Sequence, residues 1–389
     1  MSRFTTITIQ YQFNTPAFIA GAYQEKPELR APSFKGILRW WYRAIDPRII
    51  QKKNNSESPE DKIWGGTEAN AGQSHVWIRL SNNYIDTFWQ WDKNQFDRFT
   101  QGRGRFSKNG IRYLGYTFGL RGNKERKAIA PDQNFKLSFT IVRENQLDYE
   151  DKFAIAASIW MFSMLGSCGT RSRRGFGSFQ PVEITITGRN QEEWIGIFNS
   201  FNPFTSINNP ESFSVAISVA LNAIRKNLGE FDNCSHPHCG TSFKVKFLSS
   251  YTDWQSALNA AGMAMQNFRQ RREPDCSRVK NFLTSPEHGN PAPERVTFGL
   301  PLEFRFAQIR NTTRFYPQRL TLKKDKLERF ASPLFIKIIR FSNQYYPCFF
   351  LMDGAKPGVE LPVRSTINYR DYFWEKTEVN LVKKFFDSL

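Results

Sequence analysis

Apolar and polar residues alternate along residues 4–11 (FTTITIQY), and this period of two predicts a β-strand. Helical spacing of apolar residues predicts a helix over 33–45, with Ser33 as its N-cap, and another over 149–165. Further strands are expected at 75–80, 135–142 and 179–187. The first half of the chain therefore has the order strand, helix, strand, strand, helix, strand.

This order is the β-α-β-β-α-β arrangement of a ferredoxin-like unit, in which helices cover one face of an antiparallel sheet. RNA-recognition modules share it. Residues 188–210 have the composition of a junction. We therefore predict an α+β fold with two ferredoxin-like (RRM-like) domains in tandem, an N-terminal domain over 1–190 and a C-terminal one over 191–389.

The second half supplies elements for such a domain without revealing its strand order. Helices are expected at 212–227, 253–272 and 373–388. Strands are expected at 243–248, 302–308, 334–341 and 345–351.

Charge points to a polyanionic partner. The chain of 389 residues carries 54 Lys and Arg against 36 Asp and Glu, a net charge of +18, which attracts nucleic acid above all. A merely basic surface is the alternative. No apolar run is long enough to span a membrane, the N-terminus lacks an apolar signal segment, and five cysteines do not form a disulfide scaffold. We expect a cytoplasmic protein without membrane contact.

Two basic segments are candidates for an RNA surface. On the first helix, Lys35, Arg39 and Arg43 form a stripe spaced by four, away from the apolar face and without acidic partners at i±4. The segment 98–127 holds nine basic residues and one acid, with glycines and aromatics between them, as single-stranded RNA grooves do. The alternatives are a solvated helix face and a flexible charged hairpin.

A third candidate is the loop 166–179 (GSCGTRSRRGFGSF), whose glycines allow close approach of the backbone to phosphate oxygens. Its arginines at 171, 173 and 174 add bidentate phosphate donors. The loop is not a nucleotide-binding P-loop, because GxxxxGK[ST] is absent and a helix precedes it.

Metal and catalytic chemistry have little support. Four ligand-type residues crowd into Cys234, His236, His238 and Cys239, but their spacing is not that of a zinc site, and a surface loop is the favoured interpretation over zinc. His75 lies in an expected strand, where a structural role fits better. Neither the first helix nor the Gly-rich loop contains a histidine that could act as a general base. We expect no enzyme, no bound metal and no cofactor.

Three stretches together resemble the RAMP superfamily: residues 15–44 (TPAFIAGAYQEKPELRAPSFKGILRWWYRA), 169–179 (GTRSRRGFGSF) and 329–340 (RFASPLFIKIIR). The first is similar, more narrowly, to the first-subunit family of the Cmr complex, the type III-B CRISPR effector. The resemblance does not extend over 190–290. It implies two ferredoxin-like domains at one end of a helical ribonucleoprotein of antiviral defence, the end that holds the 3′ region of the guide RNA and the bound target RNA.

The resemblance further implies that the chain contacts guide RNA, target RNA and neighbouring Cmr subunits, while catalysis belongs to other subunits. The residues expected at the RNA are Lys35, Arg39, Arg43, Arg103, Arg105, Arg112, Gly169, Arg171, Arg173, Arg174, Gly175 and Gly177. Two alternatives stay open: a RAMP-type endoribonuclease that processes guide RNA, and a purely structural cap that contacts only protein.

Overall fold

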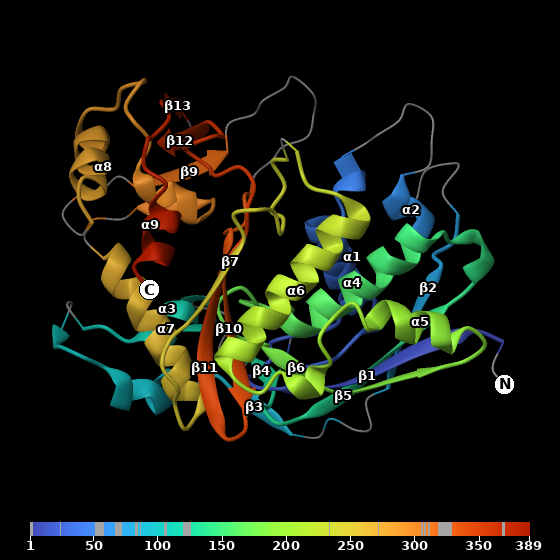
Figure 1. Ribbon diagram of the computed structural model, residues 1–389. Coiled ribbons are helices and arrows are strands. Elements are labelled where there is room, and N and C mark those ends of the chain that lie inside the picture. The colour runs from blue at the N-terminus through green and yellow to red at the C-terminus, as the bar shows by residue number, and fades with distance from the viewer. Residues whose placement is uncertain are drawn as a thin grey trace.

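Four antiparallel strands form the larger sheet of the computed structural model (Figure 1). Their bounds are Thr5–Phe13 (β1), Val76–Ser81 (β2), Asn134–Ile141 (β5) and Phe179–Thr187 (β6). They lie in the order β2-β5-β1-β6. The structure describes the whole chain except residues 1–2, 24, 51–57, 67–71, 82–84, 86, 105–106, 120–125, 233, 271, 305, 307–308, 310–311, 318–328 and 368–369.

The alternation of apolar and polar residues along the strands decides which face of this sheet is buried. Along β1, Ile7, Ile9 and Tyr11 are fully buried, while the residues between them are partly exposed. Ile7 lies opposite Phe139 and Ile9 opposite Leu137 of β5, so both strands turn their apolar residues to the same face. The predicted strands at 4–11, 75–80, 135–142 and 179–187 are all present, with small shifts at their ends.

Two helices cover this apolar face, α1 (Ala31–Ile45) and α4 (Tyr149–Leu165), and they pack on each other (Figure 1). The predicted N-cap of α1 at Ser33 is wrong. The helix begins two residues earlier, and its N-cap residue is Arg30, which makes no side-chain cap. At α4 the cap is Asp148, whose carboxylate accepts a hydrogen bond of 2.8 Å from the amide of Asp151.

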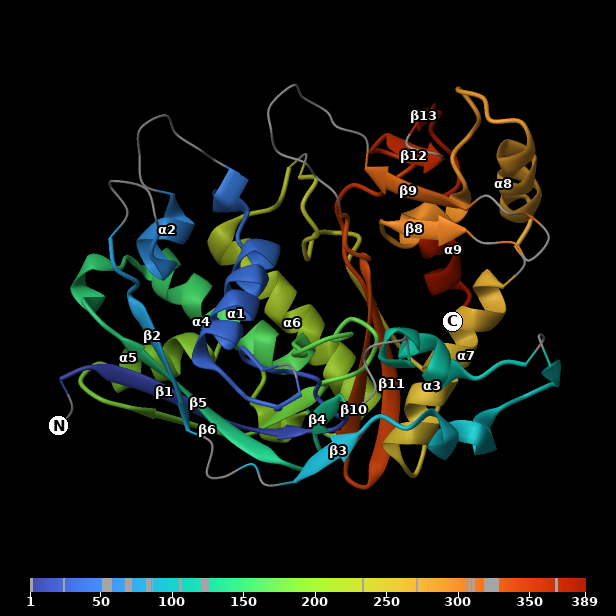
Figure 2. The same ribbon diagram turned by 180° about the vertical axis from the view of Figure 1, so that it is seen from behind.

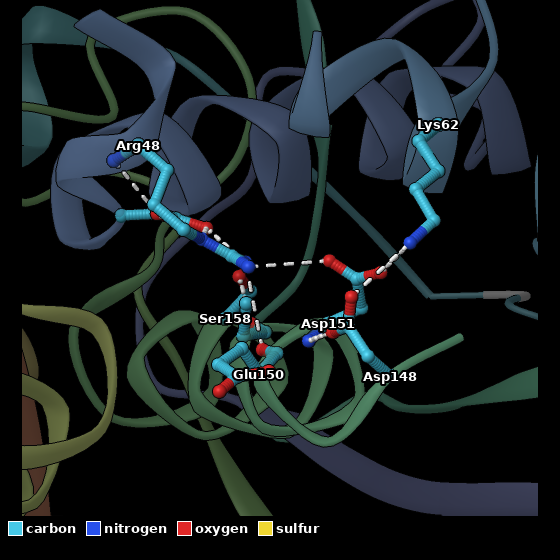
Figure 3. Close-up of polar contacts among 8 residues, drawn as sticks. Arg48, Lys62, Asp148, Glu150, Asp151 and Ser158 are labelled. Atoms are coloured by element: carbon cyan, nitrogen blue, oxygen red, sulfur yellow. Dashed lines mark hydrogen bonds and ion pairs between the residues drawn. The ribbon is translucent and has the colours of Figure 1, made fainter. Parts of the chain in front are cut away.

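A network of ion pairs holds the segment after α1 against the start of α4 (Figure 3). The carboxylate of Asp151, which is buried, accepts from Arg48 at 3.3 Å and pairs with Lys62. Arg48 also binds Asp46 at 2.8 Å. Arg48 lies in a 3₁₀ turn (Pro47–Ile50) and Lys62 in α2 (Pro59–Trp64). Because Asp46 and Asp151 are buried, their pairs with Arg48 and Lys62 fix the 3₁₀ turn and α2 against the start of α4.

The second half adds helices and a three-stranded sheet of order β10-β11-β7. Its elements, together with the connecting helix after β6, are α5 (Gln191–Phe198), α6 (Pro210–Leu228), β7 (Lys244–Phe247), α7 (Trp254–Arg269), β10 (Leu334–Phe341) and β11 (Gln344–Leu351). Helix α6 packs on α4, and α7 packs on β10 and β11. The predicted helices at 212–227 and 253–272 and the predicted strands at 243–248, 334–341 and 345–351 are confirmed.

A smaller four-stranded sheet lies at the end of the molecule that carries the C-terminal elements (Figure 2). Its strands are Leu302–Phe304 (β8), Thr313–Pro317 (β9), Val363–Ile367 (β12) and Arg370–Trp374 (β13), in the order β13-β12-β9-β8. Helices α8 (Asp275–Thr284) and α9 (Leu381–Asp387) accompany it. The predicted helix over 373–388 is wrong in its first part, because residues 370–374 pair with β12.

The two halves of the chain share one core. A single cluster of buried apolar side chains runs from Ile7 in β1 to Met352 after β11. Strand β10 also joins the Gly-rich loop directly, since the amide of Ile336 donates to the carbonyl of Arg173 at 3.1 Å. The side chain of Asn14 donates to the carbonyl of Ile338 at 3.0 Å. We call this junction of the Gly-rich loop with β10 the loop–strand seam.

Lys337 of β10 is buried in this seam, with 1% of its surface exposed. Its amine donates to the carbonyl of Met164 at 2.7 Å, near the C-terminus of α4. Cys348 lies directly opposite it on β11. Burial lowers the pKa of Lys337 to about 7, because a charged amine without water is unfavourable.

None of the helices within the described ranges combines the length and apolar character that a membrane span requires.

Stability should rise with pH around neutrality because of Lys337. The pKa of its amine is about 7 in the folded chain and ~10.4 in the unfolded chain, so the unfolded chain binds more protons between these values. The free energy of unfolding, measured by urea denaturation, should increase by about 1.5 kcal/mol from pH 7.0 to 8.5. Lys337→Met should abolish this increase, whereas Lys226→Met, at an exposed position of α6, should retain it. Equal pH dependence in both variants would contradict the assignment.

Candidate nucleic-acid interface

The basic stripe of α1 is partly neutralised by a carboxylate from α2. Glu60 accepts from Arg39 at 2.6 Å and from Arg43 at 2.7 Å, so the expectation of cations without acidic partners is wrong for both arginines. Partial burial opposes ionisation of Glu60, but the hydrogen bonds from Arg43 and Arg39 keep the pKa of its carboxyl below its usual value. Lys35 has no ion pair among the described residues, and partial burial with the nearby Arg39 lowers its pKa.

The described part of the segment 98–127 includes a helix packed against the second half of the chain. It contains α3 (Gly110–Leu114), which packs closely on α7: a Cβ atom at Gly110 would lie 2.0 Å from the carbonyl oxygen of Asn259. Arg112 donates to the carbonyl of Lys93 at 3.0 Å and pairs with Asp97.

Other predicted members of this segment differ in exposure. Arg103 is exposed, and Arg105 lies outside the described residues. Phe118, expected among the base-stacking aromatics, is buried and stacks on Phe18 with ring centroids 3.9 Å apart. Tyr116 is 59% exposed and remains available to a ligand.

Glycines of the Gly-rich loop are required by close backbone packing. Gly169, Gly175 and Gly177 all have positive φ, of 86°, 85° and 63°. A Cβ atom at Gly177 would lie 1.9 Å from the carbonyl oxygen of Cys168, and one at Gly169 would lie 2.6 Å from that of Phe18. The amide of Gly177 donates to the carbonyl of Pro16 at 2.8 Å, so it is not a free phosphate donor.

Two of the loop's arginines support β10. Arg173 donates to the carbonyl of Ser332 at 2.8 Å, and its guanidinium lies 4.4 Å from the ring centre of Phe335. Arg174 donates to the carbonyl of Leu334 at 3.4 Å. Burial lowers the pKa of Arg173 to about 10 and, together with the nearby Arg269, that of Arg174 to about 9. Reversing the charge of Arg173 would therefore damage the fold as well as any RNA contact.

A cavity of about 900 Å³ opens beside the Gly-rich loop. Its walls come from the loop, α3, the end of α7, the segment 298–303 and the segment 330–332. Its basic lining residues are Arg171, Arg174, Arg269 and Arg314, and its aromatic ones are Tyr113, Tyr116, Phe298 and Phe330. We call it the arginine cavity. The structure thus brings Arg171 and Arg174 together with residues far away in sequence, while Lys35, Arg39, Arg43, Arg112 and Arg173 do not line it.

Charge in the arginine cavity is uneven. Glu303, its one acidic lining residue among those described, pairs with Arg314 at 3.1 Å. Arg269 donates to the hydroxyl of Tyr113 at 3.0 Å. Arg171 lies over the ring of Tyr116 at 4.3 Å, and its buried Nη2 atom has no hydrogen-bond partner in the described part of the chain. The guanidinium groups of Arg171, Arg174 and Arg269 therefore share a site without a carboxylate of their own.

Sequence reasoning missed Arg269, Phe298 and Phe330. Arg269 lies one turn after Met265, on the side of α7 that faces α3 and the Gly-rich loop, since Met265 contacts Arg174 at 3.9 Å. Only the tertiary packing of α7 reveals this position. In sequence, an arginine at the end of a helix resembles an ordinary C-terminal cation.

The segment from Cys234 to Cys239 is partly buried: Ser235 is exposed, whereas His238 and Cys239 are buried. Cys239 is buried, and its amide donates to the carbonyl of Ala44 at the end of α1 at 2.7 Å. His238 Nδ1 is 2.7 Å from the carbonyl of His236. Among the residues that the structure describes, no group of three or more His, Cys, Asp and Glu could hold a metal ion. His75, as predicted, has structural contacts, with Nδ1 2.7 Å from the carbonyl of Lys62.

His236 was not expected near either candidate surface. Its ring lies 6.2 Å from Trp40 of α1, and Arg173 lies over the same Trp40 at 5.1 Å. Burial and the nearby Arg43 lower the pKa of His236 to about 4, and its buried Nε2 has no partner among the described residues. The imidazole is therefore neutral at pH 7, beside both the first helix and the Gly-rich loop.

Comparison with known proteins supports the resemblance. The sequence model of the RAMP superfamily matches residues 10–180, less than half of the chain, a range that includes β2, β5, both covering helices and the Gly-rich loop. This part of the chain is similar to the RAMP superfamily. The resemblance recognised in the sequence is confirmed.

Two relatives from Pyrococcus furiosus are similar to this chain. CRISPR system Cmr subunit Cmr1-2 is 29% identical over 185 residues, which are 43% of this chain and 89% of that protein. Cmr subunit Cmr1-1 is 23% identical over 324 residues, 83% of this chain and 80% of that protein. Both relatives are Cmr1-type subunits of a CRISPR system.

Solved structures show the same mixed α+β fold. The crystal structure of Cmr1 from Pyrococcus furiosus in its apo form superposes with a TM-score of 0.56 at 19% identity, covering 90% of this chain and 88% of that one. A chain of the type III-B Cmr-beta complex bound to cognate target RNA, solved by cryo-electron microscopy, gives a TM-score of 0.55 at 12% identity, with 98% of each chain covered. The α+β class predicted from sequence is confirmed.

Gly177→Ala tests the packing account of the loop. The new methyl group would meet the carbonyl of Cys168 in a backbone conformation that alanine rarely adopts. We expect the free energy of unfolding to fall by at least about 2 kcal/mol in urea denaturation. Gly196→Ala is the matched control, because this exposed helical glycine has free space around its Cα and should gain up to about 1 kcal/mol. A neutral Gly177→Ala would show that the loop tolerates a side chain there.

Proposed function

We propose that this chain is a non-catalytic RNA-binding subunit of a type III-B CRISPR (Cmr) ribonucleoprotein effector, active in the cytoplasm in antiviral defence. The observation that carries the proposal is the arginine cavity, where three guanidinium groups without carboxylates of their own lie beside aromatic rings and the Gly-rich loop of a RAMP domain. Cations for phosphates and aromatics for bases are what single-stranded RNA requires. The similarity to Cmr1 subunits indicates that the assembly is the Cmr complex.

Within that assembly the chain would cap the end that holds the 3′ region of the guide RNA and the bound target RNA. Sequence choice would come from guide–target pairing, as in other RNA-guided systems, while this subunit holds the RNA backbone. Its partners are then the two RNAs and the adjacent Cmr subunits.

The domain arrangement that we propose is two ferredoxin-like domains in tandem, 1–190 and 191–389. For the first, the strand order β2-β5-β1-β6 with α1 after the first strand and α4 after the third supports the proposal, because this is the ferredoxin-like topology. For the second, support comes from the antiparallel β10-β11-β7 sheet against which α7 packs.

Exposed cations should set the salt dependence of RNA binding. About five phosphate contacts give a slope of log affinity against log salt near −3.5. Reversing two basic side chains that have no ion pair among the described residues, in Lys35→Glu with Arg103→Glu, should reduce the slope by about 1.4 and weaken binding at least ~10-fold. Fluorescence anisotropy with several single-stranded RNAs of unrelated sequence measures both. Lys226→Glu serves as a control for net charge, and a double variant that binds as the unmodified chain does would remove these residues from the interface.

An endoribonuclease that processes guide RNA is the second candidate, and one observation favours it. His236 brings a neutral imidazole next to Trp40 and Arg173, where a general base would be needed. Under the main proposal, the purified chain should leave repeat RNA intact without metal. Specific cleavage that disappears in His236→Ala would instead establish the enzyme.

Crosslinking of the assembled particle distinguishes an RNA-binding subunit from a purely structural cap. Ultraviolet crosslinking should join this chain to RNA through its aromatic residues. A particle with full RNA occupancy and no crosslink to this chain would support a role confined to protein contacts.

A further inference from the structure

The arginine cavity has the size and lining of a ligand pocket, beyond what a surface that follows an RNA backbone needs. Its volume of about 900 Å³ falls within the range of about 300–1,000 Å³ of small-ligand sites. A backbone track would be a shallow basic groove, with phosphates passing over exposed cations. Here the cations lie inside a hollow and are held in place by aromatic rings.

Its chemistry selects an anion with an aromatic or planar part. Arg171 has a buried Nη2 atom without a hydrogen-bond partner in the described part of the chain, and a buried polar group of this kind is unfavourable unless a ligand satisfies it. Arg269 likewise has a buried, unpartnered Nε among the described residues, while its Nη1 is held by Tyr113 at 3.0 Å. Arg174 is close to both and is anchored to Leu334 and Met265. A phosphate supplies the acceptor oxygens that these donors lack.

Aromatic side chains line the cavity beside these cations. Tyr116 is 59% exposed, although the guanidinium of Arg171 lies over its ring at 4.3 Å. Phe298, in contrast, is buried under Arg269 at 4.7 Å and serves to position that arginine. Tyr116 with the partly exposed Tyr113 and Phe330 therefore forms the surface on which a planar base could stack.

We infer that the arginine cavity binds a single phosphorylated nucleotide unit, with its phosphate at Arg171, Arg174 and Arg269 and its base against Tyr113, Tyr116 and Phe330. The inference rests on the proposed RNA-binding function and deepens it, because it adds a pocket for one nucleotide taken out of the stack. Two ligands offer the same phosphate and base to the cavity: a nucleotide of a bound RNA chain and a free nucleoside monophosphate.

Binding of small ligands to the full-length chain tests the pocket by itself. In isothermal titration calorimetry, the four nucleoside 5′-monophosphates should bind at least ~10-fold more tightly than the matching nucleosides and than inorganic phosphate. An RNA oligonucleotide should displace them if the pocket serves an RNA chain, whereas a free-nucleotide site would leave RNA and monophosphate bound together. Inorganic phosphate that binds as tightly as the monophosphates would reduce the site to an anion site and overturn the inference. A poly-glutamate peptide that binds more tightly than the monophosphates would overturn it in favour of a protein partner.

Filling the cavity without changing its charge gives the decisive variant. Ala331 lines the cavity and is exposed, so Ala331→Trp should weaken monophosphate binding at least ~10-fold, with Ala331→Ser as the neutral control. Arg269→Gln should weaken it similarly, and the urea midpoint of each variant reports on folding. Monophosphate affinity that is unchanged in a folded Ala331→Trp would overturn the pocket.

Measurements of RNA binding on the same variants separate the two hypotheses. Ala331→Trp should leave the salt slope of RNA binding intact, because every cation is retained, while lowering RNA affinity roughly five-fold or more through the lost base contact. If the folded chain binds RNA but no monophosphate, the nucleotide pocket is overturned and the proposed RNA-binding function stands. Failure of both ligands with the folded chain would overturn the two together.

Discussion

The loop–strand seam is the constraint on which the candidate interface depends. The Gly-rich loop turns sharply through three glycines of positive φ, and β10 is attached to it by the hydrogen bond from Ile336 to Arg173. Arg173 and Arg174 hold the residues that lead into β10, and the buried amine of Lys337 reaches the end of α4. Segments that are distant in sequence therefore meet at one rigid place, and the arginine cavity opens beside it.

Burial divides the basic residues into two groups that a sequence cannot distinguish. The guanidinium of Arg173 contacts one backbone carbonyl and two aromatic rings, so its charge serves the fold. Arg171 and Arg269, in contrast, are positioned by tyrosines but retain unpartnered nitrogen atoms. The difference lies in where each guanidinium finds its acceptors, and these acceptors come from segments up to about 160 residues away in sequence.

Sequence patterns predicted the larger sheet and its helices well, because alternation along β1 and the apolar character of α4 directly reflect burial. They failed where tertiary contacts decide. Residues 110–114, for which no helix was predicted, form α3 because Gly110 fits against α7, and residues 370–374 form a strand through pairing with β12. For the site, composition identified Arg171 and Arg174, but Arg269 could not be found before α7 was placed, and Glu60 lies too far from Arg39 along the chain for a helix-spacing rule.

The carboxylate of Glu60 has a consequence for how α1 meets nucleic acid. It occupies the same guanidinium donors on Arg39 and Arg43 that a phosphate would use, and α2 holds it in place. A polyanion that uses these donors must displace the carboxylate of Glu60. Binding at α1 therefore requires the ion pairs of Glu60 to be broken, and this cost lowers the affinity of a polyanion that contacts α1 alone.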